Sequence, residues 1–266
     1  MRTVVSTVVV LGLLSALIGY LVGDSQVRGR AAGPPAEGEV TGAAAPRVNE
    51  SGGTGPTSSS VTNRTNPTDT AGRSARSPVA VPENGTGKFS PVAVPQRTTA
   101  KTGRVVTYSL EVEGGLHADL AATARDVGDA LLDARGWQGV DHVRFEQVTP
   151  AQRKDGKKPE LVIRLVSPHQ VDTQCAPLET HGRTSCATGG HAVLNYRLWM
   201  NGVSYFGNDL ASYRDYMVNH EVGHTLGHGH QKCPKPGAPA PIMLQQTLGL
   251  DGCKPWSWPK QPAAGR

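Results

Sequence analysis

The stretch HEVGHTLGHGH, from His220 to His230, constrains this chain more than any other part of its sequence. His220 and His224 are four residues apart, so on a helix their rings lie on one face, one turn apart, and can bind one ion. Gly227 favours the end of that helix, because glycine readily adopts the left-handed conformation of a C-terminal cap. A sharp turn at this glycine can return His230 to the same ion. The spacing therefore predicts a metal site with three imidazole ligands.

The number of ligands and the neighbouring glutamate indicate what such a site does. Catalytic zinc ions have three protein ligands and a water, whereas structural zinc sites are closed by four protein ligands. Glu221 follows His220 and lies about 100° round the helix from it, which suits contact with a water better than metal ligation. Zinc lowers the pKa of such a water, and a carboxylate nearby can take its proton and pass it to a leaving amine. We therefore predict one catalytic Zn2+ bound by His220, His224 and His230, with Glu221 as the general base.

Two other residues are alternatives within the same region. His228 lies between the helix end and His230, off the ligand spacing, so we expect it beside the site or at the surface, with ligation as the alternative. Cys233 follows His230 by three residues and as a fourth ligand would make the zinc structural. A solvated helix end that is rich in histidine, with no metal, is the remaining interpretation of the whole stretch.

The stretch matches the pattern H-E-x-x-H-x-x-G-x-x-H at every specified position, and the chain resembles the metzincin metallopeptidases, which carry this long zinc signature. Metzincins also have a methionine turn beneath the zinc. APIMLQQT places Met243 thirteen residues after His230, and the resemblance implies that Met243 is the turn methionine; an ordinary core methionine is the alternative. The resemblance further implies peptide hydrolysis and a zincin-like fold, in which a Met-turn loop subdomain follows the active-site helix.

The sequence departs from the metzincin pattern at two positions. Some metzincins place a tyrosine ligand two residues after the turn methionine, but Gln245 stands there, so we expect no such ligand. Gln231, after the third histidine, fits none of the best-known subfamilies. The RGW at 135–137, the paired cysteines and the late cysteine and WP (residues 253–259) resemble an actinobacterial family of exported, metzincin-like domains with no assigned function, over residues 84–260.

The hydrophobic pattern of residues 84–260 predicts one domain with a mixed twisted sheet and two long helices, of the α+β or the α/β class, and we favour α+β. Strands are expected over 104–114, 142–148, 161–167 and 191–200, and the second copy of SPVAVP, residues 90–95, is a candidate first strand. The helices are expected over 117–137 and 209–227. Val218, Val222 and Leu226 form an apolar stripe on the second helix, which should pack on the sheet. In metzincins an edge strand pairs with extended substrate, so strand 191–200 or its flanking loop is expected to wall the cleft.

The N-terminal region predicts attachment to a membrane. Residues 3–23 carry no charge and are mostly apolar, and 21 such residues can span a hydrocarbon core of about 30 Å. We predict a transmembrane signal anchor over residues 1–23; a cleaved signal peptide and secretion are the alternative. Residues 24–83 are rich in Gly, Pro, Ala, Ser and Thr, which predicts a disordered stalk, and residues 261–266 form a short tail.

The four cysteines, Cys175, Cys186, Cys233 and Cys253, allow three pairings. An even number of cysteines behind an export signal predicts two disulfides in an oxidising compartment. We favour the two local pairs, Cys175–Cys186 and Cys233–Cys253. The domain is therefore expected outside the cell membrane, and Cys233 is expected to be unavailable to the metal.

The charge of the chain, formally +5, does not indicate a nucleic-acid partner. The basic residues are scattered, and the one short cluster (Arg153, Lys154, Lys157 and Lys158) surrounds a glycine, as in a solvated turn. Aromatic residues do not alternate with basic ones, as they do in single-strand binders.

Together these features predict a membrane-tethered, extracytoplasmic zinc metalloendopeptidase that acts on a peptide or protein of the cell envelope. One alternative is a zinc-containing binding or structural module of the envelope with little activity. Another is a zinc amidase that acts on cell-wall peptides. Glu221 favours the enzyme, because a structural zinc ion needs no general base.

Overall fold

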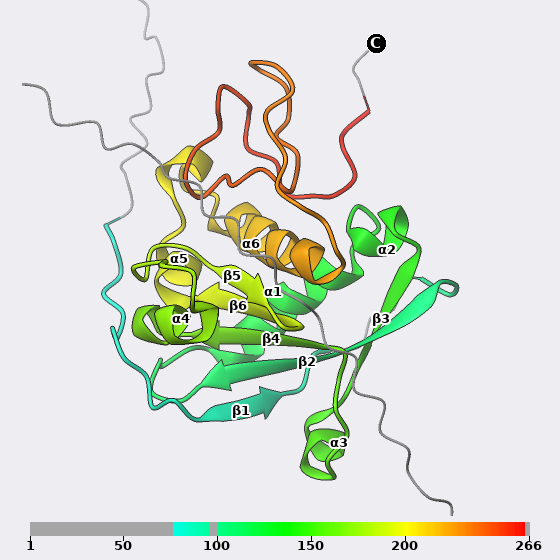
Figure 1. The fold of residues 1–266 in the computed structure, drawn as a ribbon, viewed down its shortest axis with the longest axis vertical. Helices are drawn as coiled ribbons and strands as arrows, with labels where there is room; N and C mark the ends of the chain where they lie inside the picture. The colour runs from blue at the N-terminus through cyan, green and yellow to red at the C-terminus, as the bar shows by residue number, and fades with distance from the viewer. Residues whose placement is uncertain (1–76, 96–99, 264–266) are drawn as a thin grey trace, which may run out of the picture. The chain divides into compact units, whose positions relative to one another are not determined.

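A mixed β-sheet with helices on both faces organises the computed structural model, which describes residues 77–95 and 100–263 (Figure 1). The predicted anchor, most of the predicted stalk and the last three residues lie outside this part. Over the described residues, no helix combines the length and the apolar character that crossing a bilayer requires.

The sheet in the described residues has six strands in the order β1-β2-β4-β6-β5, with β3 paired to the first half of β2. Strands β2, β3, β4 and β6 run parallel, and β1 and β5 are antiparallel to their neighbours. The mixed sheet is as predicted, and β1 confirms the candidate strand in the second SPVAVP copy. The six strands are β1 (Phe89–Val92), β2 (Arg104–Glu113), β3 (Val143–Gln147), β4 (Leu161–Val166), β5 (Cys186–Thr188) and β6 (His191–Asn195).

The two predicted long helices are α1 and α6, and each begins at an aspartate whose side chain accepts a backbone N–H two or three residues into the helix. The strand predicted over 191–200 was partly wrong. It ends at Asn195, whose side chain accepts from the Arg197 N–H at 2.9 Å and so starts α5. The helices are α1 (Leu120–Leu132), α2 (Trp137–Val140), α3 (Pro150–Lys154), α4 (Pro168–Cys175), α5 (Tyr196–Asn201), the 3-10 helix η1 (Ser204–Phe206) and α6 (Leu210–Thr225).

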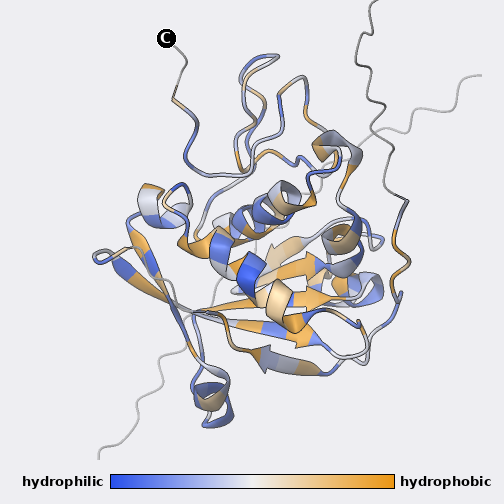
Figure 2. Cartoon of the chain, turned by 180° about the vertical axis from the view of Figure 1, so that it is seen from behind, coloured by the Kyte–Doolittle hydropathy of each residue, from blue (hydrophilic) through white to orange (hydrophobic). Residues whose placement is uncertain are grey.

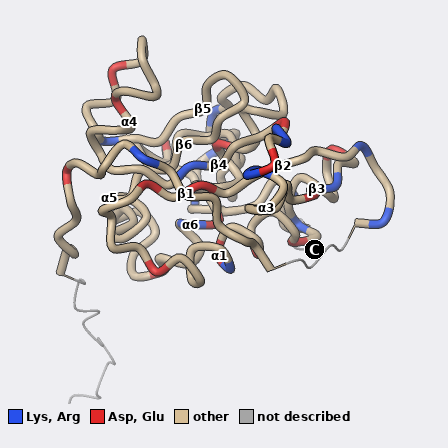
Figure 3. Tube along the Cα trace, turned by 90° about the horizontal axis from the view of Figure 1, so that it is seen from below, with Lys and Arg blue, Asp and Glu red and all other residues tan. Residues whose placement is uncertain are grey.

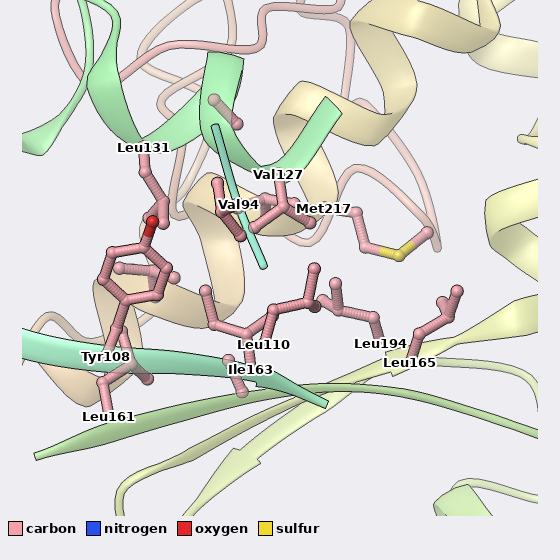
Figure 4. Close-up of a cluster of buried hydrophobic side chains, with 14 of the residues drawn as sticks. Val94, Tyr108, Leu110, Val127, Leu131, Leu161, Ile163, Leu165, Leu194 and Met217 are labelled. Carbon is pink, nitrogen blue, oxygen red and sulfur yellow. The ribbon is translucent and has the colours of Figure 1, made fainter. Parts of the chain in front are cut away.

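The main core lies between the sheet and helices α1 and α6 (Figure 4). Apolar residues that are nearly inaccessible to solvent fill it, among them Leu110, Ile163, Leu194, Val127 and Met217. Figure 2 shows the same pattern as apolar colouring along the strands. Burial of each such side chain stabilises the fold by about 1.5–3 kcal/mol, so α6 is held firmly against the sheet.

The predicted apolar stripe of α6 is confirmed. Val218 and Val222 are 0% exposed, and Leu226 packs partly buried against the same core. This orientation leaves the neighbouring stripe of the helix, which carries the candidate ligands, free to face the loops beyond it.

The opposite face of the sheet contains buried carboxylates that are fully paired. Glu111 accepts from Arg153 at 2.6 Å and from Arg164 at 2.9 Å, and Glu113 accepts from the backbone N–H of Ser167 at 2.7 Å. Arg153, from the predicted basic cluster, is thus held in an ion pair. Acidic and basic residues are interspersed along the chain (Figure 3).

Both predicted local disulfides are present. Cys175–Cys186 joins α4 to strand β5, and Cys233–Cys253 closes the segment that follows α6. Such bonds persist in oxidising compartments, so the domain belongs in an extracytoplasmic environment.

Residues 77–83, which the sequence assigned to the stalk, contact the domain. The backbone of Val79 exchanges two hydrogen bonds with the Asn201 side chain, at 2.6 and 3.0 Å. The Glu83 carboxylate pairs with Arg197, and the Glu83 carbonyl accepts from the His169 N–H. These residues therefore pack against α4 and α5.

Asp215, on α6, predicts a pH-dependent stability. Burial raises its pKa to about 7; Arg135 opposes this shift, and Asp126, Asp133 and Asp129 add to it. Because the folded pKa exceeds the unfolded value, the folded state loses stability as the pH rises from about 4 to about 7. Asp215→Asn should therefore be more stable than the wild type by about 1–2 kcal/mol at pH 8 and about equally stable at pH 4. Urea unfolding at both pH values measures this difference, and an equal gain at both would exclude ionisation of Asp215 as its cause.

Candidate metal centre

Three histidines converge at the C-terminal end of α6. His220 and His224 come from consecutive turns of the helix, and His230 comes from the segment that folds back over it. One ring nitrogen from each lies within 4.8 Å of the others. The closest approach is 3.1 Å, between Nε2 of His224 and Nε2 of His230. The three residues that the spacing predicted as ligands are thus brought together.

The turn that brings the chain from the end of α6 back to His230 depends on Gly227. Its φ is 101°, a left-handed conformation that is strained for residues with a side chain. The Gly227 N–H donates to the His224 carbonyl, and the His228 N–H donates to the Gly223 carbonyl. These bonds end the helix and turn the chain toward His230, as the sequence predicted.

Backbone carbonyls fix the orientation of the two helical rings. Nδ1 of His220 lies 2.8 Å from the Ile242 carbonyl, and Nδ1 of His224 lies 2.9 Å from the His228 carbonyl. A carbonyl only accepts, so each Nδ1 carries the proton and each Nε2 keeps a free lone pair. This is the arrangement that histidine ligands require.

Electrostatics favours neutral rings at this position. Burial is the largest cause that lowers the pKa of His220, to about 3, and the neighbouring His224 and His230 lower it further. Burial likewise lowers the pKa of His224. Metal ligation needs unprotonated imidazole, so burial keeps His220 and His224 in the form that binds a cation.

The donor set fits zinc. Three imidazole nitrogens suit zinc and related transition metals, whereas magnesium and calcium prefer oxygen ligands. The two alternative ligands are engaged elsewhere: Cys233 is bonded to Cys253, and Nε2 of His228 lies 2.7 Å from a carboxylate oxygen of Asp141. Neither residue belongs to the group of converging donors.

Glu221 lies in the wall of the same cavity as the three histidines and is 6% exposed. Burial raises its pKa to about 8. A cation at the histidines would lower this pKa, because opposite charge nearby favours the carboxylate. Glu221 is thus a carboxylate with little solvation, which suits proton transfer.

A cavity of about 550 Å³ opens beside the histidines. One wall is formed by residues 184–187, which include the start of the edge strand β5, and another by Gln245, Thr247 and Leu248. The predicted wall, strand 191–200 or its flanking loop, was wrong in detail. β6 lies one strand further in, and β5 together with Thr184 and Ser185, which precede it, lines the cavity. A second cavity, of about 350 Å³, shares His230, Gln245 and Leu248 with the first and continues past the histidines.

Met243 is 1% exposed, and it follows Ile242, whose carbonyl lies 2.8 Å from Nδ1 of His220. A Cβ atom added at Gly223 would come within 2.6 Å of its sulfur and within 2.5 Å of the Trp137 ring. Glycine at 223 therefore allows the helix to sit directly on this methionine. The Met243 carbonyl accepts from the Gln231 N–H at 3.0 Å, which ties the segment after His230 to the turn.

Sequence reasoning missed some residues of this region. Tyr216 lines the cavity, with its ring 5.3 Å from that of His220, and its hydroxyl donates to the Leu244 carbonyl. Its position, one helical turn before His220, was the available signal. Asp141 gave no signal, because it contacts His228 across 87 residues of sequence.

Comparison with known proteins gives one match. A family model described as "Protein of unknown function (DUF3152)" matches residues 76–258. The expected resemblance to a family of unassigned function is supported at this coarse level, and the matching model is not one of a metzincin family. No curated protein and no solved structure matches the chain.

Proposed function

Because the chain belongs to the DUF3152 family, whose description names no function, we propose a function from its own site: zinc-dependent hydrolysis of peptide bonds. The observation that carries this proposal is the convergence of three histidines beside a cavity that also contains Glu221. The ligands would be His220, His224 and His230. Both of the nearby candidates for a fourth ligand are engaged elsewhere, which favours a catalytic over a structural metal.

Each residue of the site has a distinct part in the proposed reaction. Zinc, when bound, polarises the peptide carbonyl and lowers the pKa of a water. Glu221 accepts the proton of the attacking water and delivers it to the nitrogen of the leaving amine. The bonds to Ile242 and His228 hold two ligand rings in place, so little reorganisation is needed during the reaction.

A metzincin-type arrangement is part of the proposal. The antiparallel edge strand β5 lies along the cavity, where an extended substrate can add to the sheet. The burial of Met243 against Gly223 of α6, the helix that carries two of the candidate ligands, supports its assignment as the turn methionine. Gln245 lines the cavity in the position that carries a tyrosine ligand in some metzincins.

The location of the substrate follows from the compartment. The disulfides indicate an extracytoplasmic domain, and the apolar residues 3–23 support a membrane tether. We propose peptides or proteins of the cell envelope as substrates. A second cavity adjoins the first at His230, Gln245 and Leu248, which gives an extended substrate room beyond the histidines and favours cleavage within a chain over removal of a terminal residue.

Removal and return of the metal test this function. Wild-type protein should cleave a peptide library at internal bonds, lose this activity after treatment with a chelator, and regain it when one equivalent of zinc is added. Mass spectrometry of the products gives the cleavage sites. Protein that carries one zinc ion but cleaves neither peptides nor cell-wall material would instead support a binding module, and cleavage of cell-wall material alone would support an amidase.

A further inference from the structure

His228 is held on two sides of its ring, although it is not one of the converging histidines. Its Nε2 lies 2.7 Å from the Asp141 carboxylate. Its ring stacks on Trp137, with 4.2 Å between centroids and an angle of 20° between the planes. An ion pair or charge-assisted hydrogen bond and a stacked ring together restrict both the position and the rotation of the imidazole.

The two residues that hold His228 are themselves anchored. Trp137 is 3% exposed, and its indole Nε1 donates to the Asn219 carbonyl of α6 at 2.8 Å. Asp141 ends α2, and its backbone N–H donates to the Trp137 carbonyl at 2.8 Å. The segment of residues 137–141 is thus fixed to the helix that carries the first two candidate ligands.

The backbone of His228 connects this anchor to two of the three candidate ligands, His224 and His230. Its carbonyl lies 2.9 Å from Nδ1 of His224 and fixes the tautomer of that ring. His230 follows two residues later, in the exposed segment that turns back after α6. We call this segment, residues 227–231, the return segment. If the His228 side chain were released, the carbonyl that orients His224 and the path of the chain to His230 would shift together.

We propose that Trp137, Asp141 and His228 form a clamp that positions His224 and His230 for the metal. This inference rests on the proposed zinc site and extends it to residues that do not touch the ion. Asp141 and Trp137 are positioning residues, contributed by a part of the chain far from the ligands in sequence. The clamp keeps the return segment in the binding conformation before the metal arrives.

Zinc affinity of the full-length chain tests the clamp directly. Asp141→Ala and His228→Ala should each weaken zinc binding about 10–100-fold, the usual effect when a partner that orients a ligand is lost. Asp141→Asn should restore most of the affinity, because its amide oxygen still accepts a hydrogen bond from the ring. Asp133→Ala is the matched control: Asp133 lies before α2 as Asp141 lies after it, its carboxylate bonds Arg135, and the change should leave the affinity unchanged. Competition with a chromophoric chelator gives the dissociation constants.

The thermal unfolding of the zinc-free variants separates positioning from a loss of fold. If Asp141→Ala is unfolded without zinc, the zinc affinity of His228→Ala decides whether the clamp positions the ligands. The change in that variant lies in the return segment, outside the core. Wild-type zinc affinity in folded His228→Ala overturns the clamp, and so does an equal loss of affinity in Asp133→Ala. A wild-type chain that binds no zinc would contradict the proposed function itself, so the two failures are distinguishable.

Discussion

Replacement of Glu221 by glutamine is expected to lower kcat/KM for peptide hydrolysis about 10²–10⁴-fold, the usual contribution of a general base, while one equivalent of zinc stays bound. Glutamine has nearly the same shape but cannot accept the proton of the attacking water. Glu221 lies in the cavity wall beside the three histidines and is not required to hold the metal. Steady-state kinetics on a cleaved peptide, with zinc content measured on the same sample, gives both quantities.

A matched control is Glu160→Gln. Glu160 is an exposed glutamate that pairs with Arg104 at 2.6 Å and does not line the cavity. This variant should keep wild-type kinetics within a factor of about two, since surface ion pairs contribute little. If Glu221→Gln kept wild-type kcat/KM with zinc bound, the role of Glu221 as the base would be wrong.

Replacement of His230 by alanine should weaken zinc binding by more than about 100-fold, because loss of a direct ligand costs more than loss of the partner that orients one. His230 is exposed and lies in the return segment, outside the core. The fold of the zinc-free domain should therefore survive the change. Chelator competition, with circular dichroism as the check on folding, measures the effect.

His169→Ala serves as the control for this experiment, because His169 is exposed on α4 and does not line the cavity. Its zinc affinity should equal that of the wild type. Full zinc occupancy of His230→Ala at the wild-type dissociation constant would show that His230 is not a ligand, and the three-histidine site would have to be abandoned.

The convergence of the histidines could be predicted because local geometry determines most of it. The four-residue spacing places His220 and His224 on one helical face, and Gly227 permits the turn that returns His230. The apolar stripe of Val218 and Val222 then fixes which face of the helix meets the sheet. No long-range information is needed for any of these steps.

The walls of the cavity could not be predicted in the same way. Strand β5 has only three residues, too few for an alternating pattern to be recognised. The apolar run that follows β6 looked like its continuation, but capping by Asn195 turns it into α5. Whether a short stretch forms a strand or a helix depends on single hydrogen bonds of this kind and on the segments that pack against it.

Contacts between segments that are distant in the chain also could not be predicted from the sequence. Helix α4 has a recognisable start, with Ser167 as its cap and Pro168 in the first turn. Its disulfide to β5 was predicted, but its hydrogen bond to Glu83 was not. The contact of Asp141 with His228 joins residues that share no periodic pattern. Only the packing of α2 against α6 brings them together.

X-ray absorption at the zinc edge of the wild-type protein tests the central claim most directly. A catalytic site of His220, His224 and His230 predicts one zinc ion per chain, with three imidazole nitrogens and one oxygen at about 2.0–2.1 Å. A sulfur ligand at about 2.3 Å, a fourth imidazole, or no stoichiometric zinc at all would contradict it.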